Sequence, residues 1–220
     1  MNILITGASR GIGNAIMKKY SAEGHTTVCP TRSELDLLNR ESIAKYIREN
    51  ENETFDCIIN NAGINPLNLI EDISDEDLYD CIQVNLIAPT LIINGFVNGM
   101  KSKKKGYIIN IGSIWGVVSK EKRSAYAMSK NGIHGLTNTL AIELGPYNIL
   151  VNTVCPGFTK TELTAQNISP ELEKKLCEDI PLGRFAQPKE IAEVVYWLGS
   201  ENNKYLTGQK VVVDGGFSVR

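Results

Sequence analysis

A tyrosine and a lysine four residues apart, Tyr126 and Lys130, are the residue pair in this sequence best suited to acid–base chemistry. The pattern around them predicts a long helix, in which residues four apart share one face. A phenol normally ionises at about pH 10, so it exchanges protons poorly at neutral pH unless a neighbouring cation favours the phenolate. Lys130 could be that cation, although the same spacing also arises by chance on helix surfaces.

Two polar side chains upstream could assist such a pair. Ser113 follows a predicted strand at residues 107–111, where it either donates a hydrogen bond into a ligand cleft or merely ends the strand. Asn85 lies in an apolar helical surround, and a buried asparagine needs partners, so it is either a satisfied structural group or a holder of ordered water. Reducing a ketone requires a donor where negative charge develops on the oxygen. Tyr126 and Ser113 supply two such hydroxyls.

A glycine-rich turn follows the first predicted strand, residues 2–6, and opens a helical pattern. Strand, turn and helix together aim backbone N–H groups and the positive helix end at a pyrophosphate. The spacing Gly-x-x-x-Gly-x-Gly departs from the usual dinucleotide fingerprint, so a turn without a chemical role is the alternative. If the turn binds a dinucleotide, we expect the contacts to come from Gly7, Ser9, Arg10, Gly11, Ile12 and Gly13.

The connection after the second predicted strand, residues 25–29, is unusually short. Residues 30–35 alone separate this strand from Asp36, and the next helix is predicted at residues 39–50. A parallel crossover with its helix needs at least about 10–12 residues. We therefore predict an α/β fold with a Rossmann-like, doubly wound, mostly parallel sheet. This sheet should lack one edge strand and its crossover helix after the second strand.

The same connection bears on cofactor choice. A carboxylate just after the second strand favours a ribose 2′-hydroxyl, whereas an arginine there favours a 2′-phosphate. Arg32 lies in that position and Arg10 could reach the same phosphate, while Glu34 argues in the opposite direction. The sequence therefore favours NADP, with NAD as the alternative. Asp36 and Leu37 complete the contacts expected on this side.

A third predicted strand, residues 56–60, ends in Asn60-Asn61-Ala62-Gly63. Small and amide-bearing residues allow close backbone approach and side-chain hydrogen bonding at a strand end. The carboxyl ends of strands form the ligand-binding edge of an open parallel sheet. Asn61, Ala62 and Gly63 therefore join the expected cofactor contacts. Further strands at residues 148–154 and 210–213 and a helix at residues 188–198 complete the pattern.

Composition narrows the classes of protein. A chain of 220 residues with 42% hydrophobic content fits one domain spanning residues 1–220. A net charge of −2 provides no basic field for nucleic acid or an anionic membrane. No signal-peptide pattern or membrane-spanning segment is apparent, so we expect a cytoplasmic protein. His25 and His134 lie apart without acidic or cysteine clusters, so we expect no metal site.

Six segments in order resemble the successive motifs of the short-chain dehydrogenase/reductase family across nearly the whole chain. The pattern is most similar to members of the β-ketoacyl-(acyl-carrier-protein) reductase type. The resemblance implies that Tyr126 is the catalytic acid–base and that Lys130 lowers its pKa and holds the nicotinamide ribose. It also implies that Ser113 polarises the substrate carbonyl and that Asn85 holds a water in a proton relay. The six segments are residues 6–13, residues 60–63, Asn85, Ser113, residues 126–130 and residues 152–157.

The resemblance extends to the later part of the chain. Pro156, Gly157 and Thr159 would lie beside the nicotinamide, with Thr159 contacting its carboxamide or phosphate, and residues 161–178 would form a mobile substrate lid. Family members are usually tetramers, so a homo-oligomer, tetramer or dimer, is expected.

Three functions remain open at this stage. The first is an NADP-dependent reductase of a carbonyl in a small molecule or a β-ketoacyl thioester. The second is an NAD-dependent sugar or polyol dehydrogenase, and the third is a cofactor-bound regulatory protein without turnover. The substrate itself is not specified by these residues. Lys120, Lys122 and Arg123 would either meet a substrate phosphate or merely solvate their loop.

Overall fold

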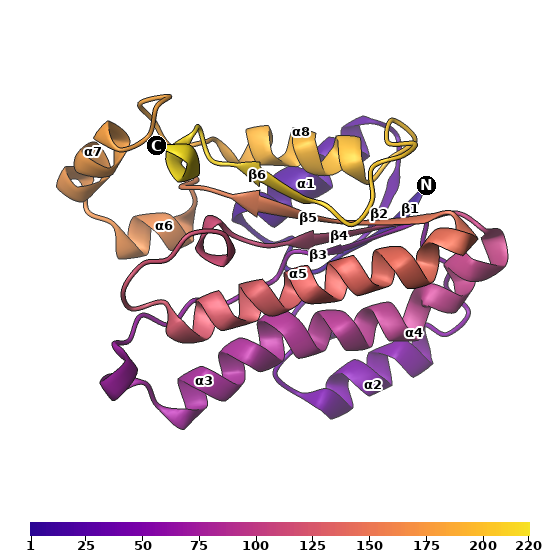
Figure 1. The fold of residues 1–220 in the computed structure, drawn as a ribbon. Coiled ribbons are helices and arrows are strands. Elements are labelled where there is room, and N and C mark those ends of the chain that lie inside the picture. Colours follow the sequence, from indigo (N-terminus) through magenta and orange to yellow (C-terminus); the bar gives the residue numbers. More distant parts are fainter.

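The computed structural model describes the backbone of residues 1–220 and the side chains of all of them except residues 163, 166 and 167. Its centre is a six-stranded sheet with the order β2-β1-β3-β4-β5-β6, in which every neighbouring pair is parallel (Figure 1). Each predicted strand is present, with ends that differ by at most two residues. The strands are β1 (Asn2–Ile5), β2 (Thr26–Val28), β3 (Cys57–Asn60), β4 (Gly106–Ile111), β5 (Ile149–Pro156) and β6 (Lys210–Val213).

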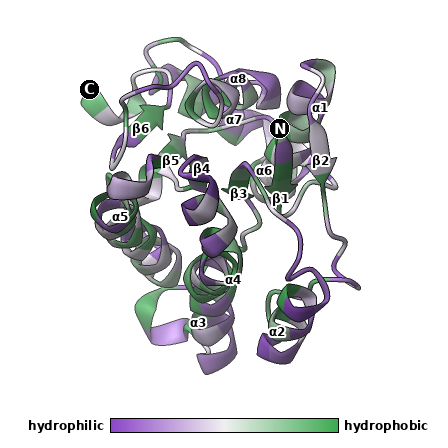
Figure 2. Cartoon of the chain, turned by 90° about the vertical axis from the view of Figure 1, so that its right-hand side faces the viewer, coloured by the Kyte–Doolittle hydropathy of each residue, from purple (hydrophilic) through white to green (hydrophobic). Residues whose placement is uncertain are grey.

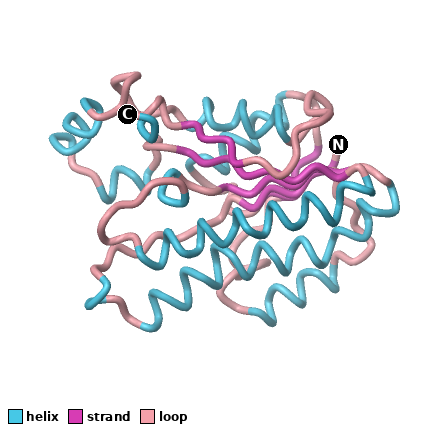
Figure 3. Tube along the Cα trace, viewed as in Figure 1, coloured by secondary structure: helices cyan, strands magenta, loops and turns pink.

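Helices cover both faces of the sheet, as Figures 2 and 3 show. Helices α1 (Gly11–Ala22) and α8 (Pro188–Leu198) lie on one face, and α2 (Arg40–Glu49), α4 (Ala88–Lys103) and α5 (Ser124–Leu144) lie on the other. Successive strand residues point to opposite faces. In β1, Leu4 accordingly packs beneath α2, α4 and α5, whereas Ile3 and Ile5 pack beneath α1 and α8. The two apolar layers explain why the central strands are hydrophobic throughout.

The edge of the sheet at β2 is trimmed as predicted. Only α2 lies between β2 and β3, and β2 is a three-residue edge strand. Asn39 begins α2, because its side chain accepts hydrogen bonds from the backbone N–H groups of Glu41 and Ser42. The predicted absence of one strand and one crossover helix is therefore confirmed.

One long helical stretch, Asp75–Lys103, corrects an expectation. It comprises α3 (Asp75–Ile82), a π-helical segment (Gln83–Ile87) and α4, and by length and composition it could cross a membrane. The sequence suggested no such segment. Half of its most apolar window is buried inside the protein, and Ile92, Phe96 and Met100 belong to the core beneath α4. Its hydrophobicity is thus accounted for by packing against the sheet.

The chain between β5 and β6 forms α6 (Glu162–Asn167) and α7 (Pro170–Glu178) before it reaches α8. These two short helices stand beyond the carboxyl end of β5 (Figure 1), which is where the resemblance implies a lid. Short 3₁₀ turns occupy other connections, at Ile70–Asp72, Ile114–Gly116, Gly145–Tyr147 and Phe217–Val219.

Candidate active site

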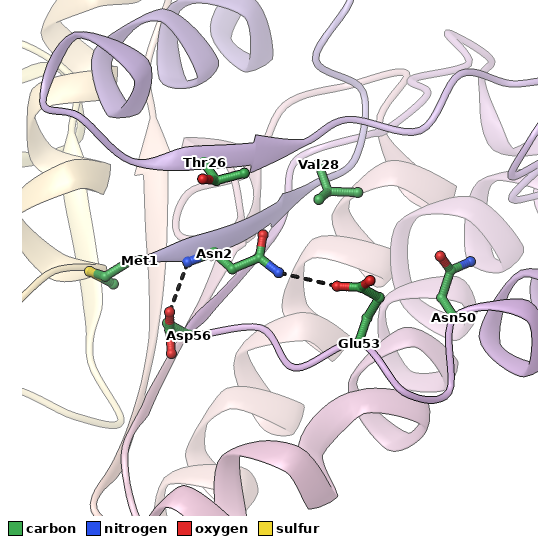
Figure 4. Close-up of a pocket in the computed structure, with 7 residues that line it drawn as sticks. All are labelled: Met1, Asn2, Thr26, Val28, Asn50, Glu53 and Asp56. Carbon is green, nitrogen blue, oxygen red and sulfur yellow. Dashed lines mark hydrogen bonds between the residues drawn. The ribbon is translucent and has the colours of Figure 1, made fainter.

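The residues predicted for the site gather at the carboxyl ends of the strands. A cavity of about 440 Å³ lies at the amino-terminal edge instead, where the backbone N–H of Asn2 donates to Asp56 at 2.8 Å (Figure 4). No residue predicted for the site lines this cavity, so it is not the candidate site. Its lining residues are Met1, Asn2, Thr26, Val28, Asn50, Glu53 and Asp56.

Lys130 is buried at the carboxyl end of β4. Helix α5 directs its side chain to the sheet, where Nζ donates a hydrogen bond to the carbonyl oxygen of Ile111 at 2.8 Å. The residue is only 3% exposed, and burial lowers the pKa of its ammonium group to about 8. The same Nζ lies 5.5 Å from the centroid of the Tyr126 ring. The predicted helix therefore brings the pair together on one face.

Tyr126 and Ser113 form the second part of the arrangement. Ser113 is buried at the end of β4, and its Oγ accepts a hydrogen bond from the backbone N–H of Trp115 at 3.2 Å. Burial raises the pKa of the Tyr126 phenol to about 12, whereas the nearby Ser113 hydroxyl and the charge of Arg123 act in the opposite direction. The Ser113 and Tyr126 hydroxyls therefore lie close together.

The direction of this pKa shift differs from the expectation that Lys130 lowers the pKa of Tyr126. Desolvation is the largest influence on both groups, because it disfavours the phenolate and the ammonium alike. Lys130 also donates a hydrogen bond to the Ile111 carbonyl oxygen. The protein groups by themselves therefore keep the phenol protonated.

Asn85 links the loop after β3 to a buried side chain of α5. It is 1% exposed, and it lies in the π-helical segment, a type of irregularity that is frequent at functional sites. Its Oδ1 accepts from the N–H of Ile64 at 2.9 Å, and its Nδ2 donates to Ile64 O at 2.8 Å and to Ser129 Oγ at 3.0 Å. A Cβ on Gly63 would lie 3.1 Å from Asn85 Oδ1 and 3.5 Å from Lys130 Nζ. Asn85 and Lys130 therefore flank Gly63.

The glycine turn fits a pyrophosphate. Gly7 and Gly11 have φ angles of +68° and +56°, which favour glycine. Arg10 precedes α1 without a side-chain cap, so the first N–H groups of this helix are left for a ligand. A Cβ on Gly13 would lie 2.2 Å from Gly7 O, which explains the third glycine. Ser9 lies in the turn between β1 and α1, and Ile12 lies in the first turn of α1.

Asn61 secures this turn from the neighbouring strand end. Its Nδ2 donates to Thr6 O and Gly7 O, each at 3.0 Å. The N–H of Ala62 donates to Thr6 Oγ1 at 3.2 Å. The structure therefore brings Asn61, Ala62 and Gly63 next to the glycine turn, with the Asn61 amide occupied by backbone carbonyls.

The charges after β2 are exposed and weakly paired. Arg32 Nε lies 3.6 Å from Asp36 Oδ2, and 76% of the Arg32 side chain is exposed. The Glu34 carboxylate accepts from the N–H and the Oγ1 of Thr31, both at 2.7 Å. Leu37 accepts a hydrogen bond at its carbonyl and packs its side chain on the core. Glu34 is thus engaged within its own loop.

Arg10 faces the first residue of α6. Its Nη1 lies 3.7 Å from Glu162 Oε2, and both side chains are mostly exposed. A Cβ on Gly11 would lie 3.4 Å from the Thr161 methyl group. The segment implied to be a lid therefore touches the glycine turn.

The loop after β5 holds Pro156, Gly157 and Thr159. The N–H of Gly157 donates to Val213 O at 2.9 Å, and Thr159 Oγ1 donates to Gly157 O at 3.1 Å. A Cβ on Gly157 would lie 2.7 Å from Asp214 Cα, so this approach to β6 needs glycine. All three residues lie at the same edge as Ser113 and Tyr126.

Sequence reasoning missed two contributors. Ser129 accepts from Asn85 and donates to Tyr126 O at 2.7 Å. Its place between Tyr126 and Lys130 was an available signal. The sequence indicated Arg123 only as a positive charge in the loop beside the substrate entrance. In the structure it immediately precedes α5 and is half-buried. No sequence pattern indicated that burial.

Comparisons with known proteins agree with this geometry. A family model described as enoyl-(acyl carrier protein) reductase matches residues 31–218. The 3-oxoacyl-(acyl-carrier-protein) reductase FabG of Aquifex aeolicus is 37% identical over 237 residues, covering 97% of this chain and 95% of that protein.

Two solved structures also match the whole chain. A short chain dehydrogenase family protein from Francisella tularensis is 32% identical with a TM-score of 0.91, covering 100% of this chain and 99% of that one. A putative NAD(P) dependent gluconate 5-dehydrogenase from Beutenbergia cavernae with bound NADP is 28% identical, with a TM-score of 0.95 and coverages of 100% and 97%. The sequence motifs, the sheet and these matches agree, and the chain belongs to the short-chain dehydrogenase/reductase family.

Proposed function

We propose that this protein is an NADP-dependent oxidoreductase that reduces a carbonyl to a hydroxyl, with a β-ketoacyl thioester as one candidate substrate. The catalytic set is Asn85, Ser113, Tyr126 and Lys130. The observation that carries the proposal is that the Ser113 and Tyr126 hydroxyls lie near the buried Lys130 ammonium. The glycine turn lies at the same edge of the sheet, and the helix that follows it begins without a side-chain cap.

Tyr126 is the proton donor. Because burial raises the pKa of its phenol to about 12, the group keeps its proton at neutral pH. It can give that proton to an oxygen on which negative charge develops. Ser113 donates a second hydrogen bond to the same oxygen and fixes its position. This protonation state suits the reductive direction.

The cofactor supplies the hydride when bound. The glycine turn, Gly7 to Gly13, would hold the pyrophosphate, and Asn61, Ala62 and Gly63 would line the next strand end. Lys130 and the loop of Pro156, Gly157 and Thr159 would hold the nicotinamide side. Asp36 and Leu37 would lie at the adenine side. Asn85, through Ile64 and Ser129, fixes the surroundings of Lys130.

NADP is favoured over NAD by the charges near the glycine turn. Arg10 and Arg32 are exposed cations with only weak carboxylate contacts. Glu34, the residue that argued for NAD, directs its carboxylate to Thr31. The relative from Beutenbergia cavernae carries bound NADP, which supports the same choice.

A sugar or polyol dehydrogenase is the second candidate. The observation in its favour is the TM-score of 0.95 to a putative gluconate 5-dehydrogenase, whereas the 37% identity to a 3-oxoacyl-(acyl-carrier-protein) reductase favours the first. Measuring oxidation of gluconate with NAD against reduction of a β-ketoacyl thioester with NADPH separates them.

The remaining features of the proposal concern organisation. We propose one catalytic domain over residues 1–220, a cytoplasmic location and a homo-oligomer, tetramer or dimer. The molar mass from light scattering tests this part.

Replacing Tyr126 by phenylalanine tests the mechanism. Tyr126→Phe removes the donated proton and little volume, so kcat should fall by about 10²–10⁴-fold while the Kd for NADPH changes by less than about threefold. Tyr205→Phe, at a residue that is 96% exposed, is the matched control. Full activity in Tyr126→Phe would refute the mechanism. Wild-type protein that fails to bind NADPH at millimolar concentration would refute the proposed NADP dependence.

A further inference from the structure

The strands beneath α4 and α5 change from apolar to polar as they approach the ligand-binding edge. On this face of the sheet, a buried polar residue follows the apolar residues of each strand: Asn60 in β3, Asn110 in β4 and Thr153 in β5. The register places Asn60 opposite Asn110 and Asn110 opposite Thr153, so the three form one row across the sheet. The apolar residues two positions earlier, on the same face, are Ile58, Ile108 and Val151.

A continuous series of hydrogen bonds joins this row to α5 through Thr137. Asn60 Nδ2 donates to Asn110 Oδ1 at 2.9 Å, and Asn110 Nδ2 donates to Thr137 Oγ1 at 2.9 Å. The hydroxyls of Thr137 and Thr153 hydrogen-bond to each other at 2.7 Å. We call these four residues the polar ladder. Each is at most 4% exposed, so bulk water does not replace a partner that is removed.

Every strand of the polar ladder continues into a segment of the candidate site. Thr137 lies seven residues after Lys130, two turns along the same face of α5. The polar ladder therefore joins the helix that carries Tyr126 and Lys130 to the strands that end in the other site residues. These strand ends are residues 61–63 after Asn60, residues 111–113 after Asn110 and residues 156–159 after Thr153.

Thr137 is the firmest polar anchor of α5 on the sheet. Among the described residues, two further α5 side chains hydrogen-bond to a strand. Lys130 Nζ donates to Ile111 O at 2.8 Å, but its flexible four-carbon chain can keep that bond while the helix moves. His134 Nε2 lies 3.8 Å from Cys155 Sγ, and sulfur is a weak partner. The side chain of Thr137 is short and stiff at χ1, so its bonds restrain the helix backbone itself.

We infer that Thr137 is a positioning residue for the reaction. Its bonds to β4 and β5 fix α5 along both strands, and thereby hold Tyr126 and Lys130 in place relative to Ser113. The apolar contacts of α5 are non-directional and do not set this alignment by themselves. A misplacement of about 1 Å can cost about 100-fold in rate. The inference rests on the proposed function, which makes these three side chains the reacting set.

Removing and restoring the Thr137 hydroxyl tests the inference. We would measure kcat and KM for acetoacetyl-coenzyme A, a β-ketoacyl thioester, together with the Kd for NADPH and the Tm. Thr137→Val keeps the volume and removes the hydroxyl, so kcat should fall by at least about tenfold while KM and Kd change by less than about threefold. Thr137→Ser restores the hydroxyl and should return kcat to within about threefold of wild type.

Tyr20→Phe is the matched control on the opposite face of the sheet. Tyr20 of α1 is fully buried, and its hydroxyl donates to Gly199 O at 3.0 Å. Tyr20→Phe and Thr137→Val should each lower the Tm by about 2–8 °C, because each leaves a buried group without a partner. Tyr20→Phe should nevertheless keep kcat within about twofold of wild type. If Thr137→Val does not fold, Thr153→Val removes the β5 contact alone and should lower kcat by about threefold to tenfold.

Other results would overturn the inference. An unchanged kcat in Thr137→Val, or in Thr153→Val where that variant is needed, would show that α5 keeps its place without these bonds. An equal loss of kcat in Tyr20→Phe would show that activity merely follows stability. A Thr137→Ser variant as slow as Thr137→Val would assign the effect to the methyl group.

Crystal structures with NADPH decide if wild type does not reduce the thioester. A shift of the Lys130 Cα relative to Ile111 by about 0.5 Å or more in Thr137→Val supports the inference, and an unshifted helix refutes it. Failure of the proposed function is separate, because it appears as activity retained in Tyr126→Phe or as wild-type protein that does not bind NADPH.

Discussion

The two ends of the ligand-binding edge are built differently. The catalytic end, defined by Asn85, Ser113, Tyr126 and Lys130, holds polar groups in fixed partnerships; Lys130, for example, is 3% exposed and bonded to Ile111 O. The adenine-side loop, residues 29–39, carries charges in water, with 76% of the Arg32 side chain exposed. Buried groups have no substitute partner when one is removed, whereas water replaces an exposed one. The catalytic end should therefore decide whether reaction occurs, and the adenine-side loop only which cofactor is preferred.

The trimmed sheet explains the exposure of the adenine-side loop. β2 is the edge strand, so no further strand or crossover helix covers the residues that follow it. At the catalytic end, β4 lies between β3 and β5, and Lys130 of α5 donates a hydrogen bond to the carbonyl oxygen of Ile111 at the carboxyl end of β4. The same parallel sheet thus has a buried catalytic end and a solvent-exposed adenine-side loop.

The largest effect on cofactor binding is expected in the glycine turn, at Gly13. A Cβ there would lie 2.2 Å from Gly7 O and 2.4 Å from Asn61 Nδ2. Gly13→Ala should therefore displace the phosphate turn, weakening NADPH binding by at least about 100-fold and lowering the free energy of unfolding by about 1–3 kcal/mol.

Gly135→Ala in α5 is the matched control for this substitution. No atom lies within 4 Å of a Cβ at Gly135, so alanine should stabilise the helix by about 0.5–1 kcal/mol. Fluorescence titration with NADPH and urea unfolding measure both quantities. Equal behaviour of the two variants would show that the turn tolerates a side chain.

Lys130 should make stability depend on pH. The pKa of its ammonium group falls from 10.5 in the unfolded chain to about 8 in the folded protein. Below pH 8 both states carry the proton. Between pH 8 and 10.5 the unfolded state binds more protons, so the free energy of unfolding rises with pH, by about 3 kcal/mol at most.

Replacing Lys130 by methionine should remove this rise. The measurement is urea unfolding of wild type and Lys130→Met between pH 7.5 and about 9.5. This range avoids the opposing contribution of Tyr126, whose pKa is raised from 10.0 to about 12 and which destabilises the fold only at higher pH. A difference between the two proteins that stays constant over this range would show that the ammonium is not desolvated.

The fold followed from the sequence because its signals are local. The short connection after the second strand excluded a crossover, and the Ser74 cap and acidic first turn marked the start of α3. In the site, spacing placed Tyr126 and Lys130 on one face and the order of motifs placed Ser113 opposite them.

What the sequence missed depends on packing between distant segments. The π-helical turn at Asn85, its bonds to Ile64 and Ser129, and the burial of Arg123 arise only when α3, α5 and the loop after β3 assemble. The sign of the Tyr126 pKa shift was missed for the same reason. Spacing indicated the nearby cation, whereas desolvation by the surrounding chain is the largest influence on the pKa of the phenol.

The smallest effects are expected in the adenine-side loop. Arg32→Gln should raise KM for NADPH by about threefold to tenfold and leave NADH unchanged, because Arg32 is exposed and already shares its charge with Asp36 at 3.6 Å. Glu34→Gln is the informative partner variant, since the Glu34 carboxylate is bonded to Thr31. It should change both cofactors by less than about twofold. Steady-state kinetics with NADPH and NADH measure both. A large gain of NADPH use in Glu34→Gln would mean that this carboxylate faces the ribose, and the adenine-side loop would then govern cofactor binding as firmly as the catalytic end governs the reaction.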